Sequence, residues 1–520
     1  MTDTTTQFKK QLPRNLSVQI VSFIVHIGIG IWLVPYLVGH LGRAAYGLIP
    51  IAGVMTQYVS LISQNVSVSV NRFLAIALQR NDVKEANLIF NTAFFSYLAI
   101  ALVQIPIFVL LICCANSIFT IPQELFRDTI LLLSCSAMGF LINLVCSVFS
   151  VPIYANNRLD ISRGIDIGRQ VFRVIGIVAL FLRFGPALRY VGYVDLAISV
   201  ATGLVTLVIG MRLGRVLKLS LRSYDWRKVR QLTAMGGWLF VNHVGALLFV
   251  RVDIWICNRF VGAEQAGDYA AVLQWSNLIR ATGTVMAGVI APMIIIYYAR
   301  SEMDRLIRLS QLSVRVLSLA LAIPIAILCA FSSSILTVWL GESFGHLGWL
   351  MVVMVCPLSI TMGIGPVFSI NTALNKVKWP GIVTCATGVA NLLLAVFLAK
   401  YLNWGIYGVA IAGAIILALK NALFTPVYAA AVLDQPWHTF VRSSASGIVF
   451  LAGLVGFGSV LNYCLRPTSA AQLVSLCLGI GAVGLLAAWL ILSRDDRRLI
   501  IESMPPRFQT LLTQLILLCK

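Results

Sequence analysis

The sequence is poor in charged residues and lacks the short motifs on which most enzymes depend. Only 11% of its 520 residues are Asp, Glu, Lys or Arg, whereas 59% are hydrophobic. Because a water-soluble domain carries about 25% charged residues, this composition excludes one. We also find no nucleophile-elbow serine, phosphate-binding loop, H-E-x-x-H helix or dinucleotide fingerprint. We therefore expect neither an enzyme nor a nucleotide-driven pump, and no cofactor.

The cysteines also lack a functional pattern. The chain has eleven, none in a CxxC motif or in a Cys/His set at the spacing of a metal site. Most stand singly in apolar segments, where a thiol usually packs as a small hydrophobic group. The sequence therefore predicts neither a metal site nor a disulfide framework.

The chain does contain about fourteen long apolar segments. Each is long enough to cross a hydrocarbon layer of about 30 Å as a helix of roughly 20 residues. Backbone polar groups in lipid must be satisfied within the segment, so we expect helices. The first segment, 16–38, is too long for a signal peptide core and lacks a small-residue cleavage site. The predicted fold is an all-α polytopic membrane protein.

The distribution of basic residues orients the predicted spans. The formal net charge is +20. If the N-terminus is cytoplasmic, most of the 39 Lys and Arg residues fall on the cytoplasmic side. Basic loops resist translocation, so we expect both termini in the cytoplasm. This reading explains the positive charge without nucleic acid as a partner.

The two halves of the chain resemble each other. When the first half is moved along the sequence by one fixed offset, Leu16 falls on Leu239 and Tyr46 on Tyr269. At nearly the same offset Asn156 falls on Asn375. Matches in the same order at a nearly constant offset indicate a parallel repeat of six helices. The predicted parts are an N-terminal lobe, a basic cytoplasmic linker, a C-terminal lobe, two added helices and a cytoplasmic tail: 1–211, 212–232, 233–432, 433–492 and 493–520.

Three basic residues lie inside predicted spans, namely Arg251, Arg280 and Lys420. An ionised side chain at that depth costs about 3 kcal/mol unless it faces a cavity or a partner. Arginine suits phosphate oxygens bidentately and lysine adds a compact charge, so we expect the three to bind a diphosphate. The alternative is charge balance with Asp253 and Asp195, although three cations exceed two acids.

Amide side chains recur at helical spacing in two spans. Gln57, Gln64 and Asn71 stand at every seventh position of the second span, and Gln274 and Asn277 precede the central arginine of the eighth. Side chains at this interval share one face of a helix, so each set predicts a polar stripe. Such stripes either line an aqueous cleft or join helices by hydrogen bonds. Their equivalent places in the two halves favour the cleft.

Three further residues are candidates for coupling to an ion gradient. His26 in the first span and His243 in the seventh are candidates because histidine is the residue type used most often for proton-linked switching near physiological pH. Asp253 in the seventh span could bind an ion, or it could be an ion-pair partner of Arg251 or Arg280 that fixes packing. H⁺ and Na⁺ are both possible coupling ions at this point.

Two segments carry a resemblance to a known family. These are VPYLVGHLGRAAYGL at 34–48 and, at 252–269, the pattern VDIW, FVG and AGDY. In them the chain resembles the Wzx-like polysaccharide flippases of the multidrug/oligosaccharidyl-lipid/polysaccharide (MOP) exporter superfamily. The resemblance implies a MATE-like fold of two six-helix lobes and transfer of undecaprenyl diphosphate-linked glycan by alternating access. It also implies that the two added helices form a groove for the lipid tail. The first span has His26 where the lipid II flippases carry an arginine, which makes lipid II a less expected substrate.

The leading interpretation is thus a flippase of the bacterial inner membrane for lipid-linked oligosaccharide, such as an O-antigen, capsule or exopolysaccharide unit. Its expected partners are this substrate, membrane lipid, a polysaccharide polymerase and glycosyltransferases. A second interpretation is a cation-coupled multidrug antiporter, and a third is a membrane scaffold of a glycan-synthesis complex.

Overall fold

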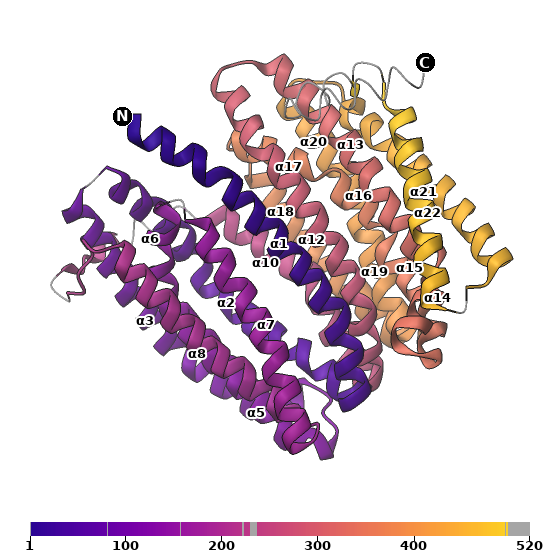
Figure 1. Ribbon diagram of the computed structural model, residues 1–520, viewed down its shortest axis with the longest axis horizontal. Coiled ribbons are helices and arrows are strands. Elements are labelled where there is room, and N and C mark those ends of the chain that lie inside the picture. Colours follow the sequence, from indigo (N-terminus) through magenta and orange to yellow (C-terminus); the bar gives the residue numbers. More distant parts are fainter. Residues whose placement is uncertain are drawn as a thin grey trace. The chain divides into compact units, whose positions relative to one another are not determined.

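The structure, a computed structural model, describes residues 2–80, 82–156, 158–220, 223–228, 237–467, 469–493 and 496–497. This part of the chain consists of α-helices with short 3-10 and π-helical segments (Figure 1). The predicted all-α class is confirmed. Twelve described helices are long and apolar enough to cross a membrane, and a bent pair, Phe240–Phe249 with Val252–Val261, makes up to thirteen.

One of the fourteen expected spans covers 166–184, and together with the bent pair it accounts for the difference from fourteen. A helix does form there, α7, but it begins earlier and runs over Leu159–Phe184. Its first fifteen residues include Arg163, Asp166, Arg169 and Arg173. These charges exclude α7 from the set that is selected by apolarity alone.

The chain divides into two compact units by its internal contacts, and each takes residues from both halves of the sequence. The first unit comprises Met1–Gln274 and Lys378–Gly413, and the second comprises Trp275–Val377 and Ala414–Lys520. Two helices, α12 (Ala263–Ala299) and α19 (Gly405–Leu419), contribute to both units. The division into two six-helix lobes stays a prediction.

In the first unit α1 packs along α7, α5 along α8, and α10 along α18. Its helices are α1 (Thr2–Leu41), α2 (Arg43–Gln79), α3 (Val83–Cys113), α4 (Ala115–Ile118), α5 (Phe126–Cys146), α6 (Ser150–Ala155), α7, α8 (Leu188–Leu213), α10 (Gly237–Val250), α11 (Val252–Ile256), the π-helical η4 (Cys257–Val261), α18 (Lys378–Val396) and η6 (Phe397–Tyr401). Two short 3-10 segments, η1 (Gln123–Leu125) and η2 (Ser147–Phe149), flank α5.

In the second unit α13 is the central helix and packs mainly against α21. The elements are α13 (Met303–Ala330), α14 (Ser332–Leu340), η5 (Glu342–Leu347), α15 (Gly348–Val355), α16 (Leu358–Gly363), α17 (Gly365–Ala373), the π-helical η7 (Lys420–Phe424), α20 (Thr425–Val432), α21 (His438–Leu465) and α22 (Ala470–Ile491). The predicted added helices correspond to α21 and α22.

Small residues allow the closest helix contacts. A Cβ atom on Gly245 of α10 would lie 2.5 Å from the Thr384 backbone carbon of α18, and one on Gly388 would lie 2.8 Å from the Gly245 carbonyl oxygen. Neither position can therefore hold a larger residue without a shift of the backbone. Close approach of backbones is the usual basis of helix association in lipid, where burial of apolar surface gives little drive.

Candidate functional site

A buried carboxylate in the first unit is held by two neutral side chains from other helices. Asp253 of α11 is 8% exposed. The Tyr269 hydroxyl of α12 donates to Asp253 Oδ2 at 3.1 Å, and Asn391 Nδ2 of α18 donates to Oδ1 at 3.3 Å. Tyr58 of α2 lies near enough to interact with Asp253 electrostatically. Four helices thus converge on one acidic group.

Asn391 presents an oxygen to the same place. The residue is 0% exposed, and its Oδ1 atom has no hydrogen-bond partner among the described residues. A Cβ atom on Gly413 of α19 would lie 3.6 Å from Asp253 Oδ2 and 3.7 Å from Asn391 Oδ1. The absence of a side chain at Gly413 therefore leaves room beside two oxygen atoms. Carboxylate and amide oxygens are the ligands that hard cations prefer.

A break in the seventh predicted span positions Asp253. The helix axis bends by 44° where α10 ends at Val250 and α11 begins at Val252, with Arg251 between them. Arg251 has φ −122° and ψ −23°, outside the helical range, and is half-buried. In the part of the chain that the structure describes, no Asp or Glu oxygen lies within 4 Å of its guanidinium. The sequence shows no Pro or Gly at this break, so it was not predicted.

A second polar cluster of the first unit joins α7 to α8. The Arg173 guanidinium donates to both oxygens of Asp195, at 2.6 and 3.0 Å, and Tyr46 of α2 interacts with Arg173 electrostatically. Arg173 is thus a further half-buried basic residue, which was not singled out from the sequence. The spacing of Arg163, Asp166 and Arg173 along one face of α7 was the signal that could have identified it.

The two clusters are related by the internal repeat. At the offset that relates the two halves, Tyr46 beside Arg173 corresponds to Tyr269 beside Asp253. The first cluster contains a guanidinium and a carboxylate, whereas the second contains a carboxylate and an amide.

The three predicted diphosphate ligands are divided between the units. Arg251 belongs to the first unit, whereas Arg280 of α12 and Lys420 of η7 belong to the second. Lys420 begins the π-helical turn, and the buried Asn421 beside it donates to Thr361 Oγ1 at 3.3 Å. A π-helical turn of this kind often marks a functional position in a helix. The joint site stays a prediction.

The predicted polar stripes lie on continuous helices. Gln57 of α2 and Gln274 and Asn277 of α12 are half-buried. The side chains of Gln64 and Asn71 lie outside the described residues. Of the predicted coupling histidines, His243 of α10 is exposed, and His26 of α1 forms a 3.1 Å hydrogen bond with Gln170 Oε1 of α7.

Comparison with known proteins identifies the family of the chain. A family described as "Polysaccharide biosynthesis protein" matches residues 12–298. The membrane protein EpsK of Bacillus subtilis (strain 168) is 28% identical over 495 residues, which cover 94% of this chain and 97% of EpsK.

Two solved structures share the fold. The lipid II flippase MurJ in an inward closed conformation aligns with a TM-score of 0.65 and 14% identity, over 92% of this chain and 99% of MurJ. An inward-facing multidrug resistance transporter of the MATE family in the MOP superfamily aligns with a TM-score of 0.62 and 14% identity, over 86% of this chain and 98% of that transporter. The predicted MOP fold is therefore confirmed.

Proposed function

The chain belongs to the polysaccharide biosynthesis protein family, and from this premise we propose that it is a flippase of the MOP superfamily for undecaprenyl diphosphate-linked oligosaccharide. It moves an O-antigen, capsule or exopolysaccharide unit across the bacterial inner membrane by alternating access, with both termini in the cytoplasm. The observation that carries the proposal is the family match over residues 12–298, more than half of the chain. The MurJ-like fold adds support, since that neighbour is a lipid flippase.

The diphosphate of the substrate needs cations at membrane depth, and this requirement assigns roles to Arg251, Arg280 and Lys420. A diphosphate carries more than one negative charge and many acceptor oxygens, so guanidinium forks and an ammonium group bind it well. Breaks in helix geometry at Arg251 and Lys420 support this assignment, because irregular backbone at membrane depth is tolerated where it lines a cavity or is buried in protein.

The glycan carries hydroxyl groups, which require donors and acceptors in the path that it follows. The half-buried amides of Gln57, Gln274 and Asn277 provide both kinds of group. In this proposal they form the wet stripes along which sugar hydroxyls exchange hydrogen bonds during translocation.

Coupling to a cation gradient is assigned to Asp253. Asp253 supplies the negative charge, Asn391 Oδ1 supplies a second oxygen, and the bare Gly413 leaves space beside both. A hard monovalent cation such as Na⁺ fits this oxygen set, and protonation of Asp253 would use the same carboxylate. A cation bound to both oxygens would hold α11 more tightly against α18. It would thereby favour one arrangement of the broken seventh span, which consists of α10 and α11. His26, which forms a hydrogen bond with Gln170 Oε1, and His243 stay candidates for coupling to protons.

Substitution of Arg280 tests the diphosphate site. We expect Arg280→Ala to abolish glycan export in cells while the protein remains folded and present in the membrane, because the substrate loses a charged anchor at the centre of α12. Arg300→Ala provides the matched control, since Arg300 follows the same helix and is exposed. Full glycan export by a stable Arg280→Ala protein would remove Arg280 from the site.

A further inference from the structure

Two asparagines at the start of α3 hold the segment that follows α8. Asn87 Nδ2 donates to the Val216 carbonyl oxygen at 2.8 Å, and the Lys218 N–H donates to Asn87 Oδ1 at 2.7 Å. One turn later Asn91 Nδ2 donates to the Lys218 carbonyl oxygen at 2.8 Å, and the Ser220 N–H donates to Asn91 Oδ1 at 2.7 Å. Each amide therefore pairs with the backbone of the segment twice, as a neighbouring strand would.

Three further contacts fix the continuation of this segment. The Asp225 N–H donates to Thr92 Oγ1 at 3.2 Å. Lys228 Nζ lies 2.6 Å from Glu85 Oε1, and the Tyr224 ring packs edge-on against Phe95. We call the described residues 214–220 and 223–228 the strap. All of its anchors lie in the first turns of α3, so the strap is a built element of the first unit.

The anchors determine which side chains of the strap face outward. Leu217 packs against the core of α2, α3 and α5, while its neighbours Val216 and Lys218 are exposed. The outward set combines aliphatic, aromatic and basic side chains, with Leu219 52% and Trp226 71% exposed. Its members are Arg215, Val216, Lys218, Leu219, Trp226 and Arg227.

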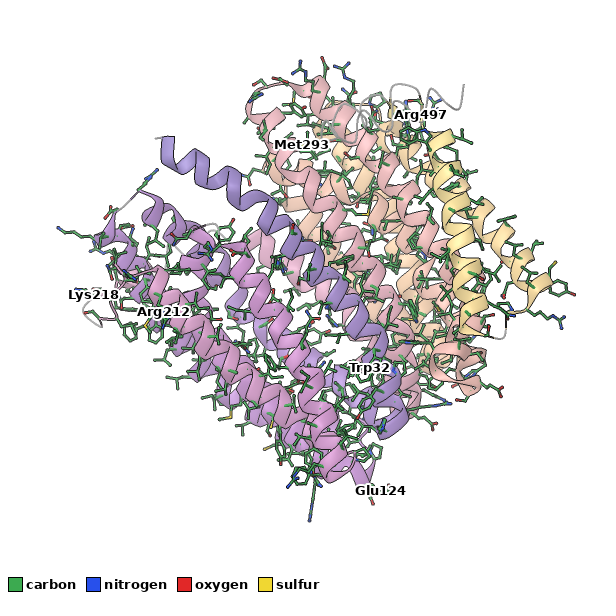
Figure 2. All side chains as sticks on the ribbon, viewed as in Figure 1. Trp32, Glu124, Arg212, Lys218, Met293 and Arg497 are labelled. Atoms are coloured by element: carbon green, nitrogen blue, oxygen red, sulfur yellow. The ribbon has the colours of Figure 1, made fainter. Side chains whose placement is uncertain are left out.

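The strap lies at one end of the helices that it joins. Figure 2 shows Arg212, at the end of α8, and Lys218 at the same end of the first unit, and Glu124 at the opposite end. Side chains near the ends of membrane-spanning helices lie at the level of lipid headgroups. Tryptophan and aliphatic groups partition into that layer, and Lys and Arg are attracted to anionic lipid there.

From these observations we propose that the strap is a binding surface for anionic phospholipid headgroups. Arg215, Lys218 and Arg227 contact the phosphates, and Trp226 and Leu219 enter the headgroup layer beside them. The hydrogen bonds of Asn87 and Asn91 fix the backbone of the strap before lipid binds. Binding therefore loses little conformational entropy, because the basic side chains are already held close together. The strap connects α8 with α10, and lipid bound there anchors the junction between the two halves of the sequence.

A titration with short-chain phosphatidylglycerol tests the proposal on the purified full-length protein in neutral detergent. We expect saturable binding of phosphatidylglycerol and none of phosphatidylcholine. The triple variant Arg215→Gln, Lys218→Gln and Arg227→Gln should lose about fivefold in affinity per charge, or on the order of a hundredfold in all. The matched control removes three exposed arginines elsewhere, in the variant Arg300→Gln, Arg305→Gln and Arg308→Gln, and should bind as the wild type does.

A second variant separates the built surface from its charge. Asn87→Ala with Asn91→Ala keeps every basic residue but releases the backbone, and should weaken phosphatidylglycerol binding at least about fivefold. Thermal unfolding of each variant shows that the rest of the protein remains folded.

Equal losses of affinity in the strap and control variants would show that the effect comes from net charge alone, and would overturn the proposal. Displacement of phosphatidylglycerol by undecaprenyl diphosphate would also overturn it, because the surface would then belong to the transported lipid. Neither outcome depends on whether the chain transports glycan.

Discussion

Asp195 and Asp253 are both carboxylates on helices of the first unit, but different groups hold them. Asp195 accepts two hydrogen bonds from the Arg173 fork, whereas Asp253 accepts from the Tyr269 hydroxyl and the Asn391 amide. The internal repeat relates the tyrosines of the two clusters, Tyr46 and Tyr269. The first cluster thus pairs its carboxylate with a guanidinium, and the second holds its carboxylate beside an amide whose oxygen has no hydrogen-bond partner among the described residues.

This difference assigns different tasks to the two copies. A bidentate guanidinium–carboxylate pair is costly to separate once it is removed from water, so the Arg173–Asp195 pair fixes α7 against α8. The Tyr269 hydroxyl and the Asn391 amide that donate to Asp253 are both neutral groups. We therefore assign structure to the first cluster and ion coupling to the second.

The largest expected effect comes from breaking the first cluster. Arg173→Ala should lower the free energy of unfolding by about 3 kcal/mol, because Asp195 loses both bonds of the fork at membrane depth. Thermal unfolding in detergent measures the change. Arg163→Ala is the matched control on the same helix, since its pair with Asp166 is more than 40% exposed and should contribute under about 0.5 kcal/mol. The double variant Arg173→Ala with Asp195→Ala should recover at least half of the unfolding free energy that Arg173→Ala loses. If Arg173→Ala alone were as stable as the wild type, the structural role of the pair would be contradicted.

A smaller effect on stability, but a specific one on transport, is expected at Asp253. Asp253→Asn preserves the shape and should change the free energy of unfolding by less than about 1 kcal/mol. In the wild type, we expect a saturating cation gradient to raise the rate of glycan translocation into vesicles by a factor on the order of ten. In Asp253→Asn, the gradient should no longer change this rate. Asp304→Asn, at an exposed position of α13, provides the control. An unchanged gradient dependence in Asp253→Asn would remove this residue from coupling.

The smallest effects are expected at the repeat-related tyrosines. Tyr269→Phe removes the 3.1 Å hydrogen bond to Asp253 and should cost about 1 kcal/mol of unfolding free energy. Tyr46→Phe should cost less, because the fork of Arg173 already holds Asp195 in that copy. Paired unfolding measurements compare the two substitutions directly. Equal losses would show that the tyrosines serve packing alike in both copies.

Much of the fold could be predicted because its causes are local in the sequence. The length of an apolar segment determines whether it can span a membrane. The internal repeat relates Tyr46 to Tyr269 from the sequence alone. The predicted span at 166–184 begins later than α7, which starts at Leu159. In the structure Arg163 pairs with Asp166 along the helix, so those charges do not end it.

The parts of the site that escaped prediction depend on contacts between distant residues. Nothing near Asp253 in the sequence indicates that Asn391, which is 138 residues away, donates to it. The break at Arg251 occurs in an apolar stretch without the residues that usually bend helices, and Asn87 and Asn91 resemble ordinary polar residues at a helix start. These features follow from helix packing, which a single sequence does not specify.

The most direct test of the account uses purified wild-type protein in vesicles. A fluorescent undecaprenyl diphosphate-linked oligosaccharide is placed in one leaflet, and its appearance in the other is followed by access of a membrane-impermeant quencher, with protein-free vesicles as the control. The account predicts protein-dependent translocation of the lipid-linked glycan and no expulsion of cationic dyes. Expulsion of dyes without movement of the glycan would contradict it and would identify a multidrug antiporter instead.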